Sequence, residues 1–321
     1  MAPQAFFLVG PTAVGKSAVA HWLAERHDYE ILSADSMQVY RGLDIGTAKP
    51  ALSERRQINY WGLDLVAWQE PFSVGEYHAA ALRAVASAAA AQKHLLVVGG
   101  TGLYINSLLH GLAPRPPRNA ALRARAERLL ATQGIEALQA WLIRLDQARY
   151  QALADQRNPR RLIRALEVAT AGRAVDAKTW PRASQAPRIP GLSLPPAELH
   201  AAIERRVHQM YAAGLVEEVR ELGRQGLAAA PTAARAIGYA EVLAYLEGQC
   251  TRAEAIAATI GRTRRLAKRQ LTWFRHQANV EWLQGSAQQP LAERAQAVLA
   301  YWRQHGPTPI AQASAELTSG E

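Results

Sequence analysis

The stretch Gly10-Pro11-Thr12-Ala13-Val14-Gly15-Lys16-Ser17 decides the fold of this 321-residue chain, because it matches the phosphate-loop pattern G-x-x-x-x-G-K-[ST]. The apolar run Ala5–Val9 before it predicts a short buried strand, and Lys16–Arg26 after it predicts a helix. Glycines let successive backbone N–H groups turn toward one anion, and the helix N-terminus adds its dipole. The loop therefore predicts a diphosphate or triphosphate site, with Lys16 supplying positive charge and Ser17 a ligand for Mg²⁺.

Two further apolar runs end in small or polar residues. Tyr29–Leu32 is followed by Ser33-Ala34-Asp35-Ser36, and His94–Val98 by Gly99-Gly100-Thr101-Gly102. Strands that alternate with helices predict an α/β fold, here a P-loop NTPase-like parallel sheet flanked by helices, with its ligand at the carboxyl ends of the strands. Nucleotide hydrolysis is disfavoured, because a metal-binding Asp would normally end a strand where this chain has glycines.

Asp35 and Thr101 follow these strands, and each has a chemical and a purely structural interpretation. In this fold class Asp35 would lie across the sheet edge from the phosphate loop, where nucleoside and shikimate kinases hold the acceptor, so it could act as a base that faces a phosphorylated donor. Alternatively, Asp35 or Ser33 only caps a helix. Thr101 could equally be a helix N-cap, and the glycines before it permit close approach of the backbone to a ligand.

The sequence pattern changes after Leu112, where a Pro- and Arg-rich stretch interrupts the alternation of strands and helices. We expect an all-α insertion domain over 113–196, with helices at Ala120–Thr132, Ile135–Leu145 and Pro159–Ala171. Residues 1–112 and 197–305 would form the catalytic core, which would end in helices at Glu198–Leu222, Ala233–Glu247 and Ala253–Gln277. Residues 306–321 are small and polar and predict a disordered tail.

Positive charge is concentrated in the insertion. The chain has a net charge of +10, and between Ala113 and Pro196 it carries 15 Arg or Lys against 6 Asp or Glu, an excess of 9. A second basic cluster, interleaved with Trp273 and Phe274, comprises Arg262, Arg264, Arg265, Lys268, Arg269 and Arg275. A charge run is usually a solvated face, but two such clusters favour nucleic-acid contact through phosphate neutralisation and stacking on unpaired bases.

Cysteine content and hydropathy exclude several other classes. A single cysteine, Cys250, can form neither an intramolecular disulfide nor a thiolate zinc cage. No uncharged apolar run approaches the ~18 residues that a membrane span requires, and the N-terminal apolar run is too short for a signal peptide. The histidines lack metal-binding spacing. We therefore expect a cytoplasmic protein without a membrane partner.

Several longer blocks of sequence resemble the bacterial tRNA dimethylallyltransferases, also called tRNA isopentenyltransferases. They span residues 5 to 276 in a specific order, and comprise the phosphate loop, Ser33–Pro50, Gly99–Tyr104, Arg161–Glu167, Gly214–Val219, Arg235–Tyr239 and Leu266–Trp273. The resemblance implies transfer of a dimethylallyl group from dimethylallyl diphosphate to the exocyclic N6 amine of the adenine just 3′ of the anticodon, in tRNAs that read codons beginning with U. It further implies Mg²⁺ as cofactor, the tRNA anticodon stem-loop as partner and an enzyme that does not consume ATP. We expect the protein to be a monomer.

The resemblance also implies roles for individual residues. The loop Thr12–Ser17 would hold the diphosphate, Asp35 would be the general base, Thr101 would lie close to the reacting centre, and Lys16 and Arg206 would bind the leaving pyrophosphate. Residues implied to contact tRNA are Asp35, Ser36, Met37, Gln38, Thr101, Arg123, Arg160, Arg161, Leu162, Ile163 and Arg164, with Ser36 and Gln38 touching the target base. The chain departs from the family pattern at Asn158-Pro159-Arg160-Arg161, where Asp-Pro-Gln-Arg is usual, and at Ala202, where a further Arg is usual.

Other functions share parts of this pattern. A small-molecule or nucleoside kinase would have the phosphate loop and Asp35 but would not need the arginine-rich insertion. A non-enzymatic RNA-binding protein would account for the charge and leave the phosphate loop without a role. An adenylate isopentenyltransferase would use related chemistry on a free nucleotide, which the long basic insertion argues against.

Overall fold

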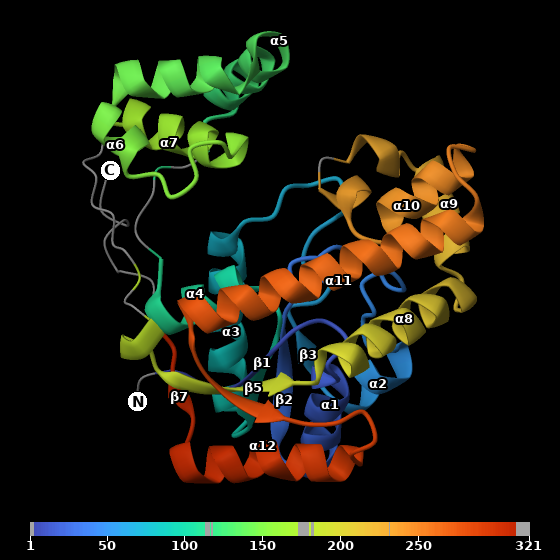
Figure 1. Cartoon of the computed structure of the whole chain (residues 1–321). Helices are drawn as coiled ribbons and strands as arrows, with labels where there is room; N and C mark the ends of the chain where they lie inside the picture. Colours follow the sequence, from blue (N-terminus) through green and yellow to red (C-terminus); the bar gives the residue numbers. More distant parts are fainter. Residues whose placement is uncertain are drawn as a thin grey trace. The chain divides into compact units, whose positions relative to one another are not determined.

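A computed structural model describes residues 3–112, 116, 118–172, 180, 183–230 and 232–312 of the chain (Figure 1). These residues divide into two compact units. Among the described residues, the larger unit contains the chain up to Gly111 and again from Trp180 to Gln312, and the smaller unit begins at Leu112. Each unit has its own cluster of buried apolar side chains, so each is described separately.

The larger unit is built on a seven-stranded sheet within the described residues, which confirms the predicted α/β class. The strands are β1 (Gln4–Val9), β2 (Tyr29–Ala34), β3 (Tyr60–Trp61), β4 (His94–Gly99), β5 (Arg188–Ser193), β6 (Asn279–Gln284) and β7 (Thr308–Pro309). The order is β3-β2-β4-β1-β5-β6, with all these neighbours parallel, and β7 pairs antiparallel with β1. Strands β1, β2 and β4 are almost wholly buried, as expected for the centre of a parallel sheet.

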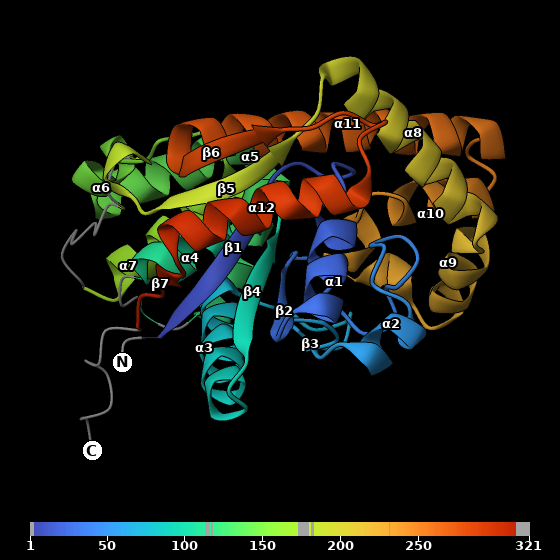
Figure 2. The ribbon, with the colours of Figure 1, turned by 90° about the horizontal axis from the view of Figure 1, so that it is seen from below.

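Helices cover both faces of the sheet. On one face α1 (Lys16–Arg26) packs beside α12 (Leu291–His305), as Figure 2 shows. Trp302 of α12 is buried and donates its indole N–H to the carbonyl of Phe7 at 3.2 Å. On the other face α4 (Gly102–His110) contacts both α3 (Val74–Ala90) and α11 (Arg252–Gln277). The remaining helices of this unit are α2 (Leu52–Gln57), α8 (Pro196–Ala212), α9 (Leu215–Arg224) and α10 (Tyr239–Leu246).

Two predicted long helices are broken by glycine. The run predicted as one helix over Glu198–Leu222 forms α8 and α9, which are separated at Gly214, where φ is +101°. Likewise, α10 begins only after Gly238, where φ is +93°. Backbone with positive φ cannot continue a right-handed helix, and glycine adopts it without steric cost.

The smaller unit is helical, as predicted for the insertion. It contains α5 (Ala120–Leu145), α6 (Gln147–Gln151) and α7 (Pro159–Thr170). The predicted break between Thr132 and Ile135 is present as a kink at Gly134, where φ is +77°. Its core includes Leu122, Leu138, Leu142, Leu162 and Leu166.

The predicted domain boundaries need two corrections. The segment Trp180–Pro196 was predicted to close the insertion, but it contains β5, which pairs with β1 and β6 in the core sheet. Pro190 and Gly191 make this strand difficult to predict from the sequence, because both residue types are depleted in strands. The expected tail is ordered over 306–312, where β7 pairs with β1 and Ile310 is buried, whereas 313–321 lie outside the described residues.

Within the described residues, no helix is both long and apolar enough to cross a membrane.

Candidate functional site

The phosphate loop joins the carboxyl end of β1 to α1. Its backbone has positive φ at Gly10 (+143°), Ala13 (+64°) and Gly15 (+95°). A Cβ at Gly10 would lie 2.6 Å from the carbonyl oxygen of Leu192 in β5, so only glycine fits between loop and sheet. No side chain caps the start of α1 at Gly15. The first N–H groups of the helix are therefore available to an anion, as the sequence pattern predicts.

Lys16 points into the base of this loop. The residue is 9% exposed, and Nζ donates to the carbonyl of Pro11 at 2.6 Å. The pKa of Lys16 is lowered from 10.5 to about 7. Burial is the largest cause, the positive charge of Arg206 acts in the same direction, and the negative charge of Asp35 partly opposes both. A bound diphosphate would favour the charged ammonium, so the loop is poised to take up a proton when an anion arrives.

Asp35 and Thr101 follow β2 and β4, whose carboxyl ends lie side by side. In the register of these strands Ala34 lies opposite Gly99. Thr101 does not cap α4 with its side chain; its Oγ1 instead accepts the backbone N–H of Ser36 at 3.0 Å. Asp35 Oδ1 accepts the backbone N–H of Met37 at 2.9 Å, which closes a turn and caps no helix. The capping interpretation of Asp35 is therefore wrong. Thr101 is the N-cap residue of α4, as its structural interpretation held, but its hydroxyl bonds to Ser36 and not to the helix.

Gln38 has its amide orientation set by three hydrogen bonds. Nε2 donates to the carbonyl oxygens of Thr47 (3.1 Å) and Ala48 (3.2 Å). Oε1 accepts the hydroxyl of Ser33 at 2.7 Å. Because the two carbonyls consume both amide protons, the amide retains only an acceptor position, on Oε1, for a ligand. Gln38 can thus recognise a hydrogen-bond donor.

Arg206 approaches from α8. Its Nη2 makes a long hydrogen bond of 3.5 Å to the carbonyl of Thr47. Burial lowers the pKa of the guanidinium, and the negative charge of Asp35 partly offsets that effect. Arg206 and Asp35 also influence the pKa of Lys16, so the two cations and the carboxylate lie within electrostatic reach of one another. The structure therefore brings Lys16, Asp35 and Arg206 together from three separate parts of the chain.

Two residues that touch the loop were not predicted to be functional. Gln270 of α11 accepts the backbone N–H of Thr12 at 2.8 Å and donates to the carbonyl of Gly100 at 3.0 Å. It thereby ties the phosphate loop to the glycine turn after β4. Arg294 of α12 donates to the carbonyl of Val14. Gln270 lies in the family-like block Leu266–Trp273, but nothing in the sequence marks Arg294.

In the smaller unit, the residues predicted to contact RNA have different environments. Arg160 and Arg161 are exposed at the start of α7, where Asn158 is the N-cap and accepts both of their backbone N–H groups. Leu162 and Ile163 are buried in the core of the unit, so their side chains do not face solvent. The exposed arginines are the part of this stretch that can reach a phosphate.

Arg123 and Arg164 are held by a buried carboxylate. Both donate to Glu167, at 3.1 Å from Arg123 Nη2 and 2.8 Å from Arg164 Nη1, and the Glu167 side chain has no exposed surface. Burial alone would raise the pKa of Glu167, but the bonds from Arg164 and Arg123 and the backbone N–H of Asn119 together lower it below 4.5. Arg123 therefore joins α5 to α7, whereas Arg164 holds Glu167 within α7 and also donates to the carbonyl of Pro116.

We expect Arg164→Ala to destabilise the smaller unit by about 2 kcal/mol, because a charge-assisted bond to a buried carboxylate is lost. Since the folded-state pKa of Glu167 is depressed, its contribution is complete above pH ~4.5, near the unfolded-state pKa, and is lost as the pH falls through the lower folded value. Hydrogen exchange of the α5 and α7 amides measures the effect. Arg160→Ala, which removes an exposed arginine of the same helix, is the control; equal protection in both variants would contradict the prediction.

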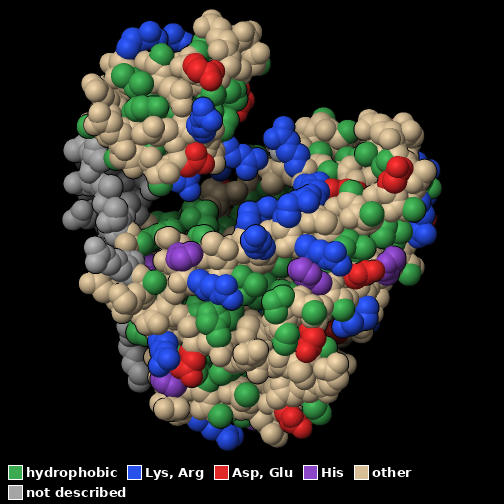
Figure 3. Space-filling view, viewed as in Figure 1, with side chains coloured by type: hydrophobic (Ala, Val, Ile, Leu, Met, Phe, Trp, Pro, Cys, Tyr) green, Lys and Arg blue, Asp and Glu red, His purple; other side chains and the backbone are tan. Residues whose placement is uncertain are grey.

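The second basic cluster lies on α11. Figure 3 shows Lys and Arg side chains gathered along this helix. Arg262 pairs with Glu241 and Arg264 with Glu204, whereas the exposed members are Arg265, Lys268, Arg269 and Arg275. Phe274 is fully buried, and Trp273 packs edge-on to it and against Gly102. The predicted stacking of RNA bases on Phe274 is therefore wrong, and the cluster offers charge without that aromatic face.

Comparisons with known proteins agree with this geometry. The model of the IPP transferase family matches residues 38–277. A tRNA dimethylallyltransferase from Corynebacterium jeikeium (strain K411) is 39% identical over 295 residues, covering 91% of this chain and 94% of that protein. Another, from Streptomyces avermitilis, is 42% identical over 288 residues, covering 89% and 92%.

Solved structures of similar proteins share the fold of this chain. The full-length tRNA isopentenylpyrophosphate transferase from Bacillus halodurans matches with a TM-score of 0.67 and 33% identity, over 94% of this chain and 98% of that one. A eukaryotic dimethylallyltransferase acting on tRNA matches with a TM-score of 0.72 over 96% of this chain and 81% of that one. Its 20% identity establishes a shared fold alone.

Proposed function

Because the chain belongs to the IPP transferase family, we propose that it transfers the dimethylallyl group of dimethylallyl diphosphate to tRNA. The acceptor is the N6 amine of the adenine 3′ to the anticodon in tRNAs that read codons beginning with U, and the enzyme acts as a cytoplasmic monomer. The observation that carries the proposal is the carboxylate of Asp35 beside two cations, Lys16 and Arg206, at the mouth of an amide-lined loop.

On the donor side, the phosphate loop holds a leaving group. The allylic carbon gains positive character as pyrophosphate departs, and negative charge grows on the bridging oxygen. The ammonium of Lys16, the guanidinium of Arg206 and the N–H groups at the start of α1 stabilise that charge.

Mg²⁺ fits this site as an ion bound together with substrate. Among the described residues no group of three His, Cys, Asp or Glu side chains could hold a metal, so the protein supplies few ligands. Mg²⁺ commonly takes one or two protein oxygens and completes its shell with phosphates and water. The exposed hydroxyl of Ser17, at the first turn of α1, would hold it. When bound, Mg²⁺ neutralises part of the diphosphate charge.

On the acceptor side, Asp35 is the general base. An adenine amine is a weak nucleophile because its lone pair is delocalised into the ring, and it becomes acidic only as the new C–N bond forms. A carboxylate within hydrogen-bond reach then accepts the proton. The free acceptor position on Gln38 Oε1 suits an amino group and not a carbonyl, which favours adenine over a 6-oxopurine.

The target base is stacked in the anticodon loop and must be extruded into the site, at a cost of a few kcal/mol. Contacts between basic residues and the RNA backbone offset this cost. In this proposal the exposed Arg160 and Arg161 of the smaller unit meet the anticodon stem-loop.

Nucleoside analysis of tRNA after incubation with the protein, Mg²⁺ and dimethylallyl diphosphate tests the function. We expect N6-dimethylallyladenosine next to the anticodon. The family assignment disfavours the kinase alternative, and a parallel incubation with labelled ATP and tRNA examines it directly. Label transferred from ATP, with no prenylated nucleoside, would refute the proposal.

Arg161→Ala should weaken binding of the anticodon stem-loop and reduce the slope of log affinity against log salt concentration by about one, because one phosphate contact is lost. The affinity for dimethylallyl diphosphate should not change. Arg144→Ala removes the same charge from an exposed position on α5 and serves as the matched control. If the two variants have identical salt slopes, Arg161 makes no specific phosphate contact.

A further inference from the structure

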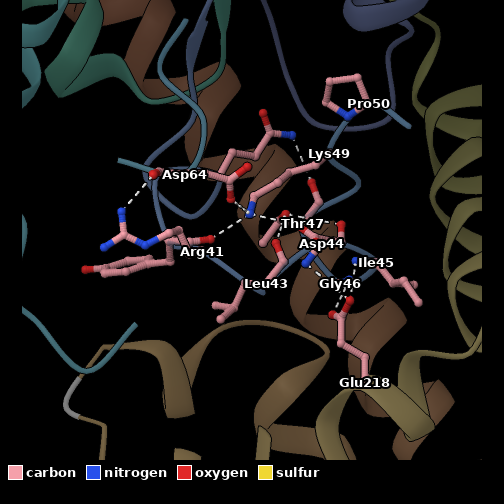
Figure 4. Close-up of polar contacts among 12 residues, drawn as sticks. Arg41, Leu43, Asp44, Ile45, Gly46, Thr47, Lys49, Pro50, Asp64 and Glu218 are labelled. Atoms are coloured by element: carbon pink, nitrogen blue, oxygen red, sulfur yellow. Dashed lines mark hydrogen bonds and ion pairs between the residues drawn. The ribbon is translucent and has the colours of Figure 1, made fainter. Parts of the chain in front are cut away.

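The segment Leu43–Lys49, between β2 and α2, is held in place by Glu218 of α9 (Figure 4). The Glu218 carboxylate accepts three consecutive backbone N–H groups, those of Asp44 (3.2 Å), Ile45 (2.8 Å) and Gly46 (3.4 Å). Three consecutive amides pointing at one carboxylate fix the backbone of the segment at that point. We call Leu43–Lys49 the junction loop.

Tyr239 reinforces this contact. Its hydroxyl donates to Glu218 at 2.6 Å. Burial and the negative charge of Glu218 both raise the pKa of Tyr239, so the phenol remains a donor. A Cβ at Gly46 would lie 2.3 Å from Cε2 of the Tyr239 ring, so the ring packs directly on the backbone of the junction loop.

Lys49 holds the other end of the junction loop. Its side chain is fully buried, and Nζ donates to the carbonyl of Tyr40 (2.6 Å), to Asp44 (2.8 Å) and to Asp64 (2.6 Å). The three protons of the ammonium are thus all used. Since Glu218 and Lys49 hold the loop from two sides, the carbonyl groups between them have little freedom to move independently of one another.

Those carbonyl groups contact both halves of the proposed site. The Thr47 oxygen accepts from Gln38 Nε2 at 3.1 Å and from Arg206 Nη2 at 3.5 Å. The Ala48 oxygen accepts the second proton of Gln38 at 3.2 Å. One carbonyl therefore touches the side chain that would recognise the acceptor base and the side chain that would bind the donor diphosphate.

From this arrangement we infer that Glu218 is a positioning residue which, through the junction loop, couples diphosphate binding to recognition of the acceptor purine. The inference rests on the proposed function. Because the held loop moves as one piece, a ligand that positions Arg206 also positions the Thr47 carbonyl and, through it, Gln38. The two ligands therefore assist each other, and by linkage each does so by the same factor. A loop released from Glu218 would no longer transmit this effect. Glu218 itself touches neither ligand.

The test measures the dissociation constant of an anticodon stem-loop with and without saturating inorganic pyrophosphate, on the full chain. We expect pyrophosphate to tighten stem-loop binding at least about fivefold in the unsubstituted protein. In Glu218→Gln the ratio should fall to below about twofold. A purely structural role would reduce the active fraction while leaving this ratio unchanged.

Glu221→Gln is the matched control. Glu221 is exposed and lies one turn further along α9, and its described hydrogen bonds are to Arg224 and Gln225, close to it in sequence. It should keep the full ratio. Tyr239→Phe removes a single hydrogen bond to Glu218 and should give an intermediate ratio, which keeps the test decisive if Glu218→Gln does not fold.

A ratio near one in the unsubstituted protein, or an unchanged ratio in the folded Glu218→Gln or Tyr239→Phe protein, would overturn the inference. These outcomes concern binding alone. Failure of the proposed function would show separately, as the absence of prenylated nucleoside in the product analysis of the unsubstituted protein.

Discussion

Replacing Asp35 with alanine should lower the turnover number at least ~10²-fold, because the amine loses the base that accepts its proton as the C–N bond forms. Affinity for tRNA should change little, since the carboxylate supplies no phosphate contact. Single-turnover prenylation of the stem-loop and a separate binding titration measure the two quantities.

Asp35→Asn separates proton transfer from local structure. The amide oxygen of asparagine can still accept the backbone N–H of Met37, which Asp35 Oδ1 accepts in the native turn, but the amide cannot act as a base. We expect Asn to be as inactive as Ala. Turnover restored by Asn would assign Asp35 to the turn and remove it from the chemistry.

Lys16→Met should lower kcat/KM by about 10²–10³-fold, because a positive charge facing the departing pyrophosphate is removed from a buried position. The affinity for inorganic pyrophosphate should fall as well. The affinity for the stem-loop, measured without diphosphate, should stay the same. Steady-state kinetics and calorimetric titration measure these effects. An unchanged kcat/KM would show that the loop amides and Arg206 suffice.

The lowered pKa of Lys16, about 7, adds a pH dependence to the same experiment. Below pH 7 the ammonium is already charged, and above pH 7 binding of an anion must be accompanied by proton uptake, so affinity should fall by up to about tenfold per pH unit. Lys16→Arg retains charge throughout this range and should lack that uptake. Calorimetry in two buffers of different ionisation enthalpy reports the protons; equal uptake in both proteins would assign the titration to pyrophosphate alone.

The local parts of the site were predictable from the sequence. The phosphate loop is encoded within eight residues, since its glycines and its lysine act through backbone geometry and charge that neighbours in sequence set up. Asp35 and Thr101 were predicted from strand ends, and their juxtaposition follows from the pairing of β2 with β4. The helical insertion was recognisable from its 3.6-residue periodicity and its charge.

Other features of the structure could not be predicted from the local sequence. Strand β5 was missed because its central Pro190 and Gly191 carry no strand preference, and it is stabilised by pairing with β1 and β6. Phe274 lies within the second basic cluster, which the sequence pattern predicts to contact RNA, but its side chain is buried in the core. In both cases the packing of elements distant in sequence overrides the local signal.

The same distinction applies to function. A contiguous run of residues is enough to predict a phosphate-binding loop, because a loop of backbone amides needs only its own conformation to bind an anion. How that anion is connected to an acceptor depends on Gln270, Arg206 and Glu218, which reach the loop segments from helices more than 150 residues away. Side chains of such separation meet only after the sheet has assembled and its helices have packed, so their roles become visible in the folded structure and not before.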